Sequence, residues 1–168
     1  MKKIETEKKY VILKPDISLL RKQNEFTKSH ITQIYLSDSE KTHRIRKRVY
    51  EDGREEYTEN TKKRISVMSA IESEKDISAE SFELLSGNIE PGSHPVLKTR
   101  ITFEYMKKTF EIDVYPEWKS SCILEVELNG EKEEINFPDF ITVIKDVTGN
   151  KAYSNHSMAH VFPEEINR

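Results

Sequence analysis

The sequence predicts a mainly β protein, a closed eight-stranded antiparallel β-barrel with a few flanking helices. Three observations support this fold class. Alternation with a period of two, typical of strands whose two faces differ, recurs about eight times. Turn signals between neighbouring runs indicate hairpins and therefore antiparallel pairing. Eight antiparallel strands can close into a barrel just wide enough to hold side chains or a small ligand.

The predicted strands are spread over the whole chain, which we expect to form one domain over residues 1–168. The alternating runs are Ile4–Ile12, Ile31–Leu36, His43–Tyr50, Glu55–Ile65, Ala70–Lys75, Val96–Tyr105, Lys108–Tyr115 and Ile123–Leu128. Tight hairpins are predicted at Glu51–Arg54 and at Met106–Lys107. The loop-rich stretch Ser86–Pro95 divides this domain into two halves.

Helices are predicted where a capping residue precedes a suitable segment. Asp16 can cap a helix that runs towards Asn24, and Ser78 can cap one that ends at Gly87. Asp139 can open a third helix that ends near Gly149, and a short fourth helix is predicted to start at Ser154.

The amino-acid composition limits the kinds of binding partner and the cellular compartment that we expect for this protein. Charged residues make up 34% of the chain but the net charge is only -3, so the basic surplus of a nucleic-acid binder is missing. Cys122 is the only cysteine, which excludes an intramolecular disulfide and indicates a reducing compartment, so we expect a cytoplasmic protein. No apolar run is long enough for a membrane helix, and the start lacks a signal peptide. We expect no membrane partner, and a homodimer is compatible with the sequence.

Charged side chains alternate along the predicted strands, and their sign is sorted strand by strand. One strand carries Arg44, Arg46 and Arg48 on one face, and others carry Lys98 with Arg100, and Glu59, Thr61 and Lys63. Carboxylate pairs occur at Glu5 and Glu7, Glu72 and Glu74, Glu111 and Asp113, and Glu125 and Glu127. Any one of these faces could be an ordinary solvent face, but like charges two residues apart repel, so the repeated sorting favours a functional role. Periodicity does not say whether these faces point inward.

The two kinds of charge suit the two halves of a phosphoryl-transfer site. Paired carboxylates are the oxygen ligands that Mg²⁺ or Mn²⁺ prefers. Arginine and lysine bind phosphate oxygens. Because the chain has no glycine-rich phosphate loop among its five glycines, phosphate binding must come from side chains.

The start of the chain, Ile4 to Val11, is similar to the Glu-x-Glu-x-Lys signature that opens the CYTH proteins, also called triphosphate tunnel metalloenzymes. Further segments resemble that family in the same order, among them Arg44-Ile45-Arg46, Thr61-Lys62-Lys63, Ile71-Glu72-Ser73-Glu74, Lys98-Thr99-Arg100, Phe110–Val114, Leu124–Glu127 and Val147–Asn155. The resemblance implies an eight-stranded tunnel with its charged residues pointing inward. It also implies Mg²⁺- or Mn²⁺-dependent hydrolysis of a small-molecule triphosphate, with inorganic tripolyphosphate the favoured substrate.

The resemblance assigns expected roles to individual residues. Triphosphate oxygens would be held by Lys9, Arg44, Arg46, Lys63, Lys98, Arg100 and Lys151; among the three arginines of one strand, the family spacing favours the first two over Arg48. The metal ligands would be Glu5, Glu7, Glu125 and Glu127, with Glu72, Glu74 and Asp113 as further candidates. Glu72 or Glu74 would take the proton of the attacking water, and Lys98 would neutralise the leaving group.

Other functions stay open at this stage. A class IV-type adenylyl cyclase, which forms cyclic AMP from ATP, would share the triphosphate site, and a non-catalytic polyphosphate- or nucleotide-binding module would share the basic residues. An ordinary barrel with an apolar ligand cavity would show no response to Mg²⁺. His156 and His160 are four residues apart, but because no third ligand lies nearby in the sequence we interpret them as surface or lid residues. Cys122 is interpreted as a buried thiol without a neighbouring base.

Overall fold

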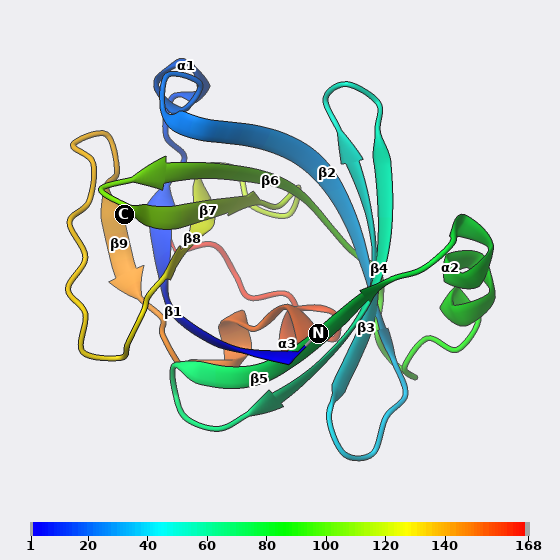
Figure 1. The fold of residues 1–168 in the computed structure, drawn as a ribbon. Helices are drawn as coiled ribbons and strands as arrows, with labels where there is room; N and C mark the ends of the chain where they lie inside the picture. The colour runs from blue at the N-terminus through cyan, green and yellow to red at the C-terminus, as the bar shows by residue number, and fades with distance from the viewer. Residues whose placement is uncertain (1, 167–168) are drawn as a thin grey trace.

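Most of the chain forms a single antiparallel sheet in the computed structural model, which describes residues 2–166 (Figure 1). The strands are β1 (Lys2–Leu13), β2 (Asn24–Leu36), β3 (Thr42–Tyr50), β4 (Glu55–Arg64), β5 (Ser69–Asp76), β6 (Val96–Tyr105), β7 (Lys108–Val114), β8 (Ser121–Glu127) and β9 (Val143–Asp146). All eight predicted strands are confirmed. β2 begins earlier than predicted, through a bulge where Glu25 has a positive φ of 55°.

The sheet closes on itself to form the predicted eight-stranded barrel. Neighbouring strands follow the order β5-β4-β3-β2-β6-β7-β8-β1, and β1 returns to β5. The first half of β1 pairs with β5 from Lys2 to Thr6, and its second half pairs with β9 from Tyr10 to Ile12. β8 pairs with β1 from Glu7 to Leu13 along the opposite edge. β1 is therefore the seam of the barrel.

Both predicted hairpin turns are present. The Tyr50 N–H donates to the Arg54 carbonyl, and Gly53 has a φ of +87°. Met106 and Lys107 both have left-handed φ values, 47° and 62°, as expected for a two-residue turn that matches the twist of its strands.

Three of the four predicted helices are present, but the first ends at Leu20 instead of running towards Asn24, which begins β2. Asp16 caps α1 (Ile17–Leu20), Ser78 caps α2 (Ala79–Ser86), which ends at Gly87, and Ser154 caps α3 (Asn155–Met158). A 3₁₀ turn, η1 (Lys151–Tyr153), precedes α3. The helix predicted from Asp139 to Gly149 is wrong: this segment contains strand β9, because the free edge of β1 at Tyr10–Ile12 provides backbone partners for it.

Apolar side chains pack in three places around the charged interior. Tyr10, Ile12 and Phe110 are in a cluster on the outer face of the sheet, and Ile34, Ile45 and Phe82 pack beneath α2. The third cluster joins strand ends to η1 and α3 and contains Val11, Tyr35, Val96, Tyr115, Trp118, Ile123, Val147, Tyr153, Met158 and Ala159. Figure 1 shows α3 lying across the ring of strands, so this cluster plugs one end of the barrel.

None of the helices within residues 2–166 has the length and apolar composition needed to cross a membrane.

Gly149 lies where the segment after β9 contacts the β4–β5 turn, and its replacement by alanine should destabilise the fold. Gly149 has a φ of +74°, and a Cβ atom there would collide with Cγ1 of Val67. Gly53 has a similar φ of +87° but open space around it, so Gly53→Ala is a matched control. We expect Gly53→Ala to cost about 1 kcal/mol through backbone strain, and Gly149→Ala to cost about 1–3 kcal/mol more through overpacking.

Urea unfolding of the two variants measures this difference. Equal free energies of unfolding for Gly149→Ala and Gly53→Ala would contradict the close packing between Gly149 and Val67.

Candidate functional site

The barrel encloses a cavity of about 760 Å³ that is lined mainly by charged side chains. The residues predicted to share the charged faces of β1, β3, β5 and β8 line this cavity, so those faces point inward. The lining residues from the strands are Lys3, Glu5, Glu7, Lys9, Tyr35, Thr42, Arg44, Arg46, Arg48, Lys62, Arg64, Glu72, Glu74, Arg100, Glu111, Glu125 and Glu127. Residues of η1 and α3, among them Lys151 and His156, line the plugged end.

One wall of the cavity is basic. It consists of the inward faces of the adjacent strands β3 and β4, and we call it the basic wall; its residues are Arg44, Arg46, Arg48, Lys62 and Arg64. The Nε atoms of Arg44 and Arg48 are buried without a hydrogen-bond partner within the described residues. A buried donor that lacks a partner costs about 1–3 kcal/mol, so this wall is suited to an anionic ligand.

Arg46 lies at the centre of the basic wall. Its Nε and Nη2 donate to the side-chain oxygen of Gln33 at 3.1 and 3.0 Å. Burial, together with the positive charges of Arg44, Arg100 and Arg48, lowers the pKa of Arg46 to about 9. The cause is crowding of like charges, which a phosphate chain between the arginines would relieve.

The opposite wall is acidic. We use this name for Glu5 and Glu7 of β1, Glu125 and Glu127 of β8, and Glu111 of β7, three strands that lie side by side. Two pairs of glutamates lie directly opposite each other in the sheet, Glu7 with Glu127 and Glu111 with Glu125. Arg100 bridges the second pair, with Nη1 2.8 Å from Glu111 and Nη2 3.7 Å from Glu125. A like-charge pair such as Glu7 with Glu127 is destabilising in the absence of a cation.

The pKa values of the glutamates in the acidic wall reflect the same crowding of negative charges. Burial and the charges of Glu125 and Glu5 raise the pKa of Glu7 to about 8. Burial and Glu111 raise the pKa of Glu127 to about 7. Burial opposes ionisation of Glu125 as well, but Lys9, whose Nζ is 3.2 Å from its Oε1, and Arg100 lower the pKa of Glu125 to about 2. An all-oxygen donor set of this kind fits a hard divalent cation such as Mg²⁺ or Mn²⁺.

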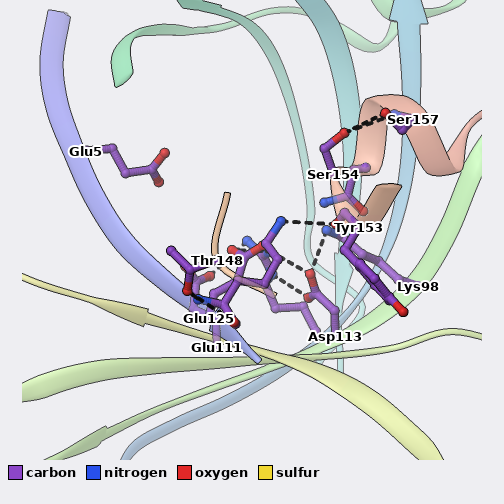
Figure 2. A network of polar contacts seen from close by, with 12 residues as sticks. Glu5, Lys98, Glu111, Asp113, Glu125, Thr148, Tyr153, Ser154 and Ser157 are labelled. Atoms are coloured by element: carbon purple, nitrogen blue, oxygen red, sulfur yellow. Dashed lines mark hydrogen bonds and ion pairs between the residues drawn. The ribbon is translucent and has the colours of Figure 1, made fainter. Parts of the chain in front are cut away.

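Asp113 does not join the acidic wall, in contrast to its expected role as a metal ligand. Figure 2 shows it bridged to Lys98 and to a neighbouring guanidinium. Arg100 Nε lies 2.7 Å from Oδ1, and both Arg100 Nη2 and Lys98 Nζ lie 2.8 Å from Oδ2. Both carboxylate oxygens are thus occupied. Burial opposes ionisation, but Arg100 and Lys98 outweigh it and hold the pKa of Asp113 well below its usual range. The role of Asp113 here is to position Arg100.

Lys98 lies behind the cavity surface rather than on it. Its side chain has no exposed area, and its ammonium group is held by Asp113. Burial and Arg100 lower the pKa of Lys98 to about 7. The geometry does not bring Lys98 into the described cavity, so direct contact with a substrate or leaving group finds no support in this arrangement.

Glu72 and Glu74 of β5 both line the cavity, but their surroundings differ. Glu72 is buried, accepts from Asn60 Nδ2 at 2.5 Å and pairs with Arg44 Nη2 at 3.3 Å. Glu74 is exposed and accepts from Asn60 at 3.3 Å. Glu72 therefore orients an arginine of the basic wall, which leaves it less suited to accept a proton from water.

Lys63 was expected to hold phosphate, and this placement is wrong. The inward face of β4 carries Asn60, Lys62 and Arg64, whereas Lys63 is exposed on the outer face. Lys62 takes its place in the cavity, with its Nζ 2.8 Å from Oε2 of Glu5. Both faces of β4 carry charged residues, so alternation alone gave no means of choosing between them.

Lys9 and Lys151 lie near the plugged end of the cavity. Lys9 Nζ contacts both Glu125 and the carbonyl of Tyr153, which links the acidic wall to the plug. Lys151 lines the cavity with an exposed side chain. The plug itself is anchored by Tyr115, whose hydroxyl donates to Asn155 at 2.7 Å.

Solved structures of other proteins share this architecture. The inorganic triphosphatase NE1496 is 25% identical in sequence, with a TM-score of 0.59 over 95% of this chain and 99% of its own. The chain has a CYTH-like fold. The PH1012 protein of Pyrococcus horikoshii OT3 (15% identity, TM-score 0.53, 76% of this chain and 80% of that one) shares the fold. So does a proposed adenylate cyclase from Bacillus halodurans (17% identity, TM-score 0.51, 78% and 83%). No protein-family model matches the chain, and no curated protein matches it.

Within the CYTH-like barrel, the structure brings most of the expected site residues together. The residues that line the cavity as expected are Glu5, Glu7, Lys9, Arg44, Arg46, Glu72, Glu74, Arg100, Glu125, Glu127 and Lys151. Charged lining residues that had no expected role are Lys3, Lys62, Arg64 and Glu111, and Arg48 lines the cavity beside the two arginines preferred over it. Glu111 shares a face with Asp113 in the sequence, and this alternation was the signal that could have found it. Cys122 is buried, and burial raises the pKa of its thiol to about 12, as expected for a packing residue.

Proposed function

We propose that this protein hydrolyses a triphosphate in a reaction that depends on Mg²⁺ or Mn²⁺, with inorganic tripolyphosphate as the substrate. The observation that carries the proposal is the separation of charge across one cavity, with a basic wall on β3 and β4 and an acidic wall on β1, β7 and β8. Each wall holds more like charge than it can neutralise internally. A phosphate chain and a divalent cation between the walls would neutralise both.

In this proposal the basic wall binds the substrate. The guanidinium groups of Arg44, Arg46 and Arg48 each have donors that face the cavity and can bind phosphate oxygens in pairs. Arg100, fixed by Asp113, adds a charge from β6. Because these groups are already positioned by Gln33, Glu72 and Asp113, little rearrangement is needed when phosphate charge shifts during the reaction.

The acidic wall would hold the cation. Glu5, Glu7, Glu125 and Glu127 are the proposed ligands, and Glu111 adds a fifth carboxylate. When bound, Mg²⁺ or Mn²⁺ would supply charge neutralisation at the phosphate oxygens. We also place proton acceptance from the attacking water on the acidic wall, since the Glu72 carboxylate is already paired with Arg44 and hydrogen-bonded to Asn60.

The similarity to NE1496 supports inorganic triphosphate as the substrate, because that protein is named an inorganic triphosphatase and the alignment covers nearly all of both chains. A binding module without turnover is less well supported, since capture of an anion alone gains nothing from five carboxylates beside it.

The first experiment measures phosphate release from tripolyphosphate, ATP and thiamine triphosphate with Mg²⁺, with Mn²⁺ and with a chelator. Adjacent residues supply a matched pair of variants, because Lys62 lies inside the barrel and Lys63 outside. We expect Lys62→Ala to lower kcat/KM for tripolyphosphate by about tenfold or more, through loss of one charge-assisted contact. Lys63→Ala should leave kcat/KM unchanged.

Equal rates for Lys62→Ala and wild type would assign the activity to a contaminant or to another site. Absence of phosphate release from all three substrates would overturn the proposal, and formation of cyclic AMP from ATP would reassign the same cavity to a cyclase.

A further inference from the structure

Three potential metal ligands from distant parts of the chain meet beside the plug. Glu90 lies in the loop between α2 and β6. His156 lies in α3, and His160 lies just after the end of α3. His156 Nε2 is 2.6 Å from Oε2 of Glu90, and His160 Nε2 is 3.2 Å from the same oxygen. All three candidate ligand atoms lie within 4.8 Å of one another.

We infer that Glu90, His156 and His160 form a binding site for a divalent transition-metal ion of the Zn²⁺ class, separate from the carboxylate cluster of the acidic wall. Two imidazoles and one carboxylate are the donor set of many three-ligand zinc sites, which leave a fourth position open. Imidazole nitrogen also discriminates against Mg²⁺, which prefers oxygen.

The geometry needs only a small adjustment to hold such an ion. Ligand atoms about 2.1 Å from a tetrahedral ion lie about 3.4 Å from one another. The His160–Glu90 distance of 3.2 Å differs from this value by about 0.2 Å, and the His156–Glu90 distance of 2.6 Å must open by less than about 1 Å. The ligand atoms of His156 and His160 lie within 4.8 Å of each other, so they must approach by no more than about 1.4 Å. All three side chains are partly exposed, with 29–41% of their area accessible, so an ion can enter from solvent.

The backbone that carries the three residues is anchored. The Glu90 N–H donates to the Tyr35 carbonyl at 2.9 Å, and Ser93 donates to the Glu90 carbonyl from both its N–H and its hydroxyl. The His94 N–H donates to the Ala159 carbonyl at 2.8 Å, which ties the loop to the end of α3. The His156 ring packs against that of Tyr35, with centroids 4.9 Å apart. A site on anchored elements loses little freedom when the ion binds.

A metal ion at this position would stabilise the plugged end of the barrel. It would join α3 to the loop that connects the two halves of the barrel, and His156, one of its ligands, lines the plugged end of the cavity. The expected consequence is a more stable plugged end, independent of whether the cavity hydrolyses triphosphate.

The test is Zn²⁺ and Co²⁺ binding by the full chain after removal of metals with a chelator, with excess Mg²⁺ present to occupy oxygen-only sites. We expect one Zn²⁺ per chain and, with Co²⁺, the strong visible absorption of a four-coordinate ion. His160→Ala and Glu90→Gln should each weaken Zn²⁺ binding by about tenfold or more, since even outer-shell changes cost about 10–100-fold. His94→Ala, which removes an exposed histidine of the same loop, is the matched control and should bind as wild type does.

The variant Glu5→Gln/Glu7→Gln separates this site from the acidic wall and should retain the Zn²⁺ affinity and the Co²⁺ spectrum. Unchanged affinity in both His160→Ala and Glu90→Gln, or loss of binding in Glu5→Gln/Glu7→Gln instead, would overturn the inference. Circular dichroism of each metal-free variant establishes that it is folded. If His160→Ala does not fold, Glu90→Gln still tests the site, because glutamine preserves the shape of the side chain.

Discussion

Replacing Glu5 and Glu7 together by glutamine should lower metal-dependent phosphate release from tripolyphosphate by at least about 100-fold. The double change removes two charges of the acidic wall while keeping the size of both side chains. It leaves the basic wall intact, so the variant should still bind tripolyphosphate. Steady-state kinetics with varied Mg²⁺ and calorimetric binding of tripolyphosphate measure the two effects separately.

The matched control is Glu80→Gln/Glu83→Gln on α2, which removes the same charge from exposed positions outside the barrel. Its rate should equal that of wild type. The Glu7 change should stabilise the fold, because burial and neighbouring carboxylates disfavour the charged form of Glu7. The Glu5 change should oppose this gain, because it removes the ion pair with Lys62 that lowers the pKa of Glu5. Full turnover by the cavity variant in the presence of a chelator would contradict a catalytic cation on the acidic wall.

Replacement of two cavity arginines should have opposite effects on stability, although we propose that both bind phosphate. Arg46→Met removes a cation crowded by other cations, and we expect the melting temperature to stay the same or rise. Arg100→Met leaves Asp113 buried with only Lys98 as its partner, and we expect a loss of about 3–5 kcal/mol. Each variant should weaken tripolyphosphate binding by about tenfold or more.

Urea unfolding of the two variants in metal-free buffer provides the comparison, with each variant serving as the control for the other. A similar loss of stability in both would show that Arg46 is compensated by groups around it and would weaken the assignment of the basic wall to anion binding. Tripolyphosphate added to wild type should raise its stability, and this rise should be smaller in Arg46→Met.

The fold could be predicted because its signals are local. The alternation of residue types with a period of two identified the eight barrel strands. The capping residues Asp16, Ser78 and Ser154 identified where three helices begin. Strand β9 could not be predicted this way, because its four residues form a strand only in contact with β1. A lone short strand has no stability of its own, so its existence depends on a partner far away in the sequence.

The site could be predicted only as far as residue type and face. Arg44, Arg46 and the glutamate pairs alternate on strands whose opposite faces are more apolar, and their inward orientation followed from the resemblance. Asp113 looked equivalent to the other carboxylates, but the register that places Arg100 directly opposite it determines its role. The same limit applies to Glu90, whose partners His156 and His160 lie in another part of the chain.

The seam at β1 has a consequence for how the protein is made. β2, β3, β4 and β5 pair with near neighbours in the sequence and can form hairpins soon after they leave the ribosome. β1 emerges first, yet most of its partners are in β8 and β9 near the other end of the chain. The Glu7–Leu13 half of β1 must therefore stay unpaired until β8 and β9 have been synthesised, whereas the Lys2–Thr6 half can pair with β5 earlier. Nascent chains that stall before β8 would expose this strand to chaperones or to pairing with other chains.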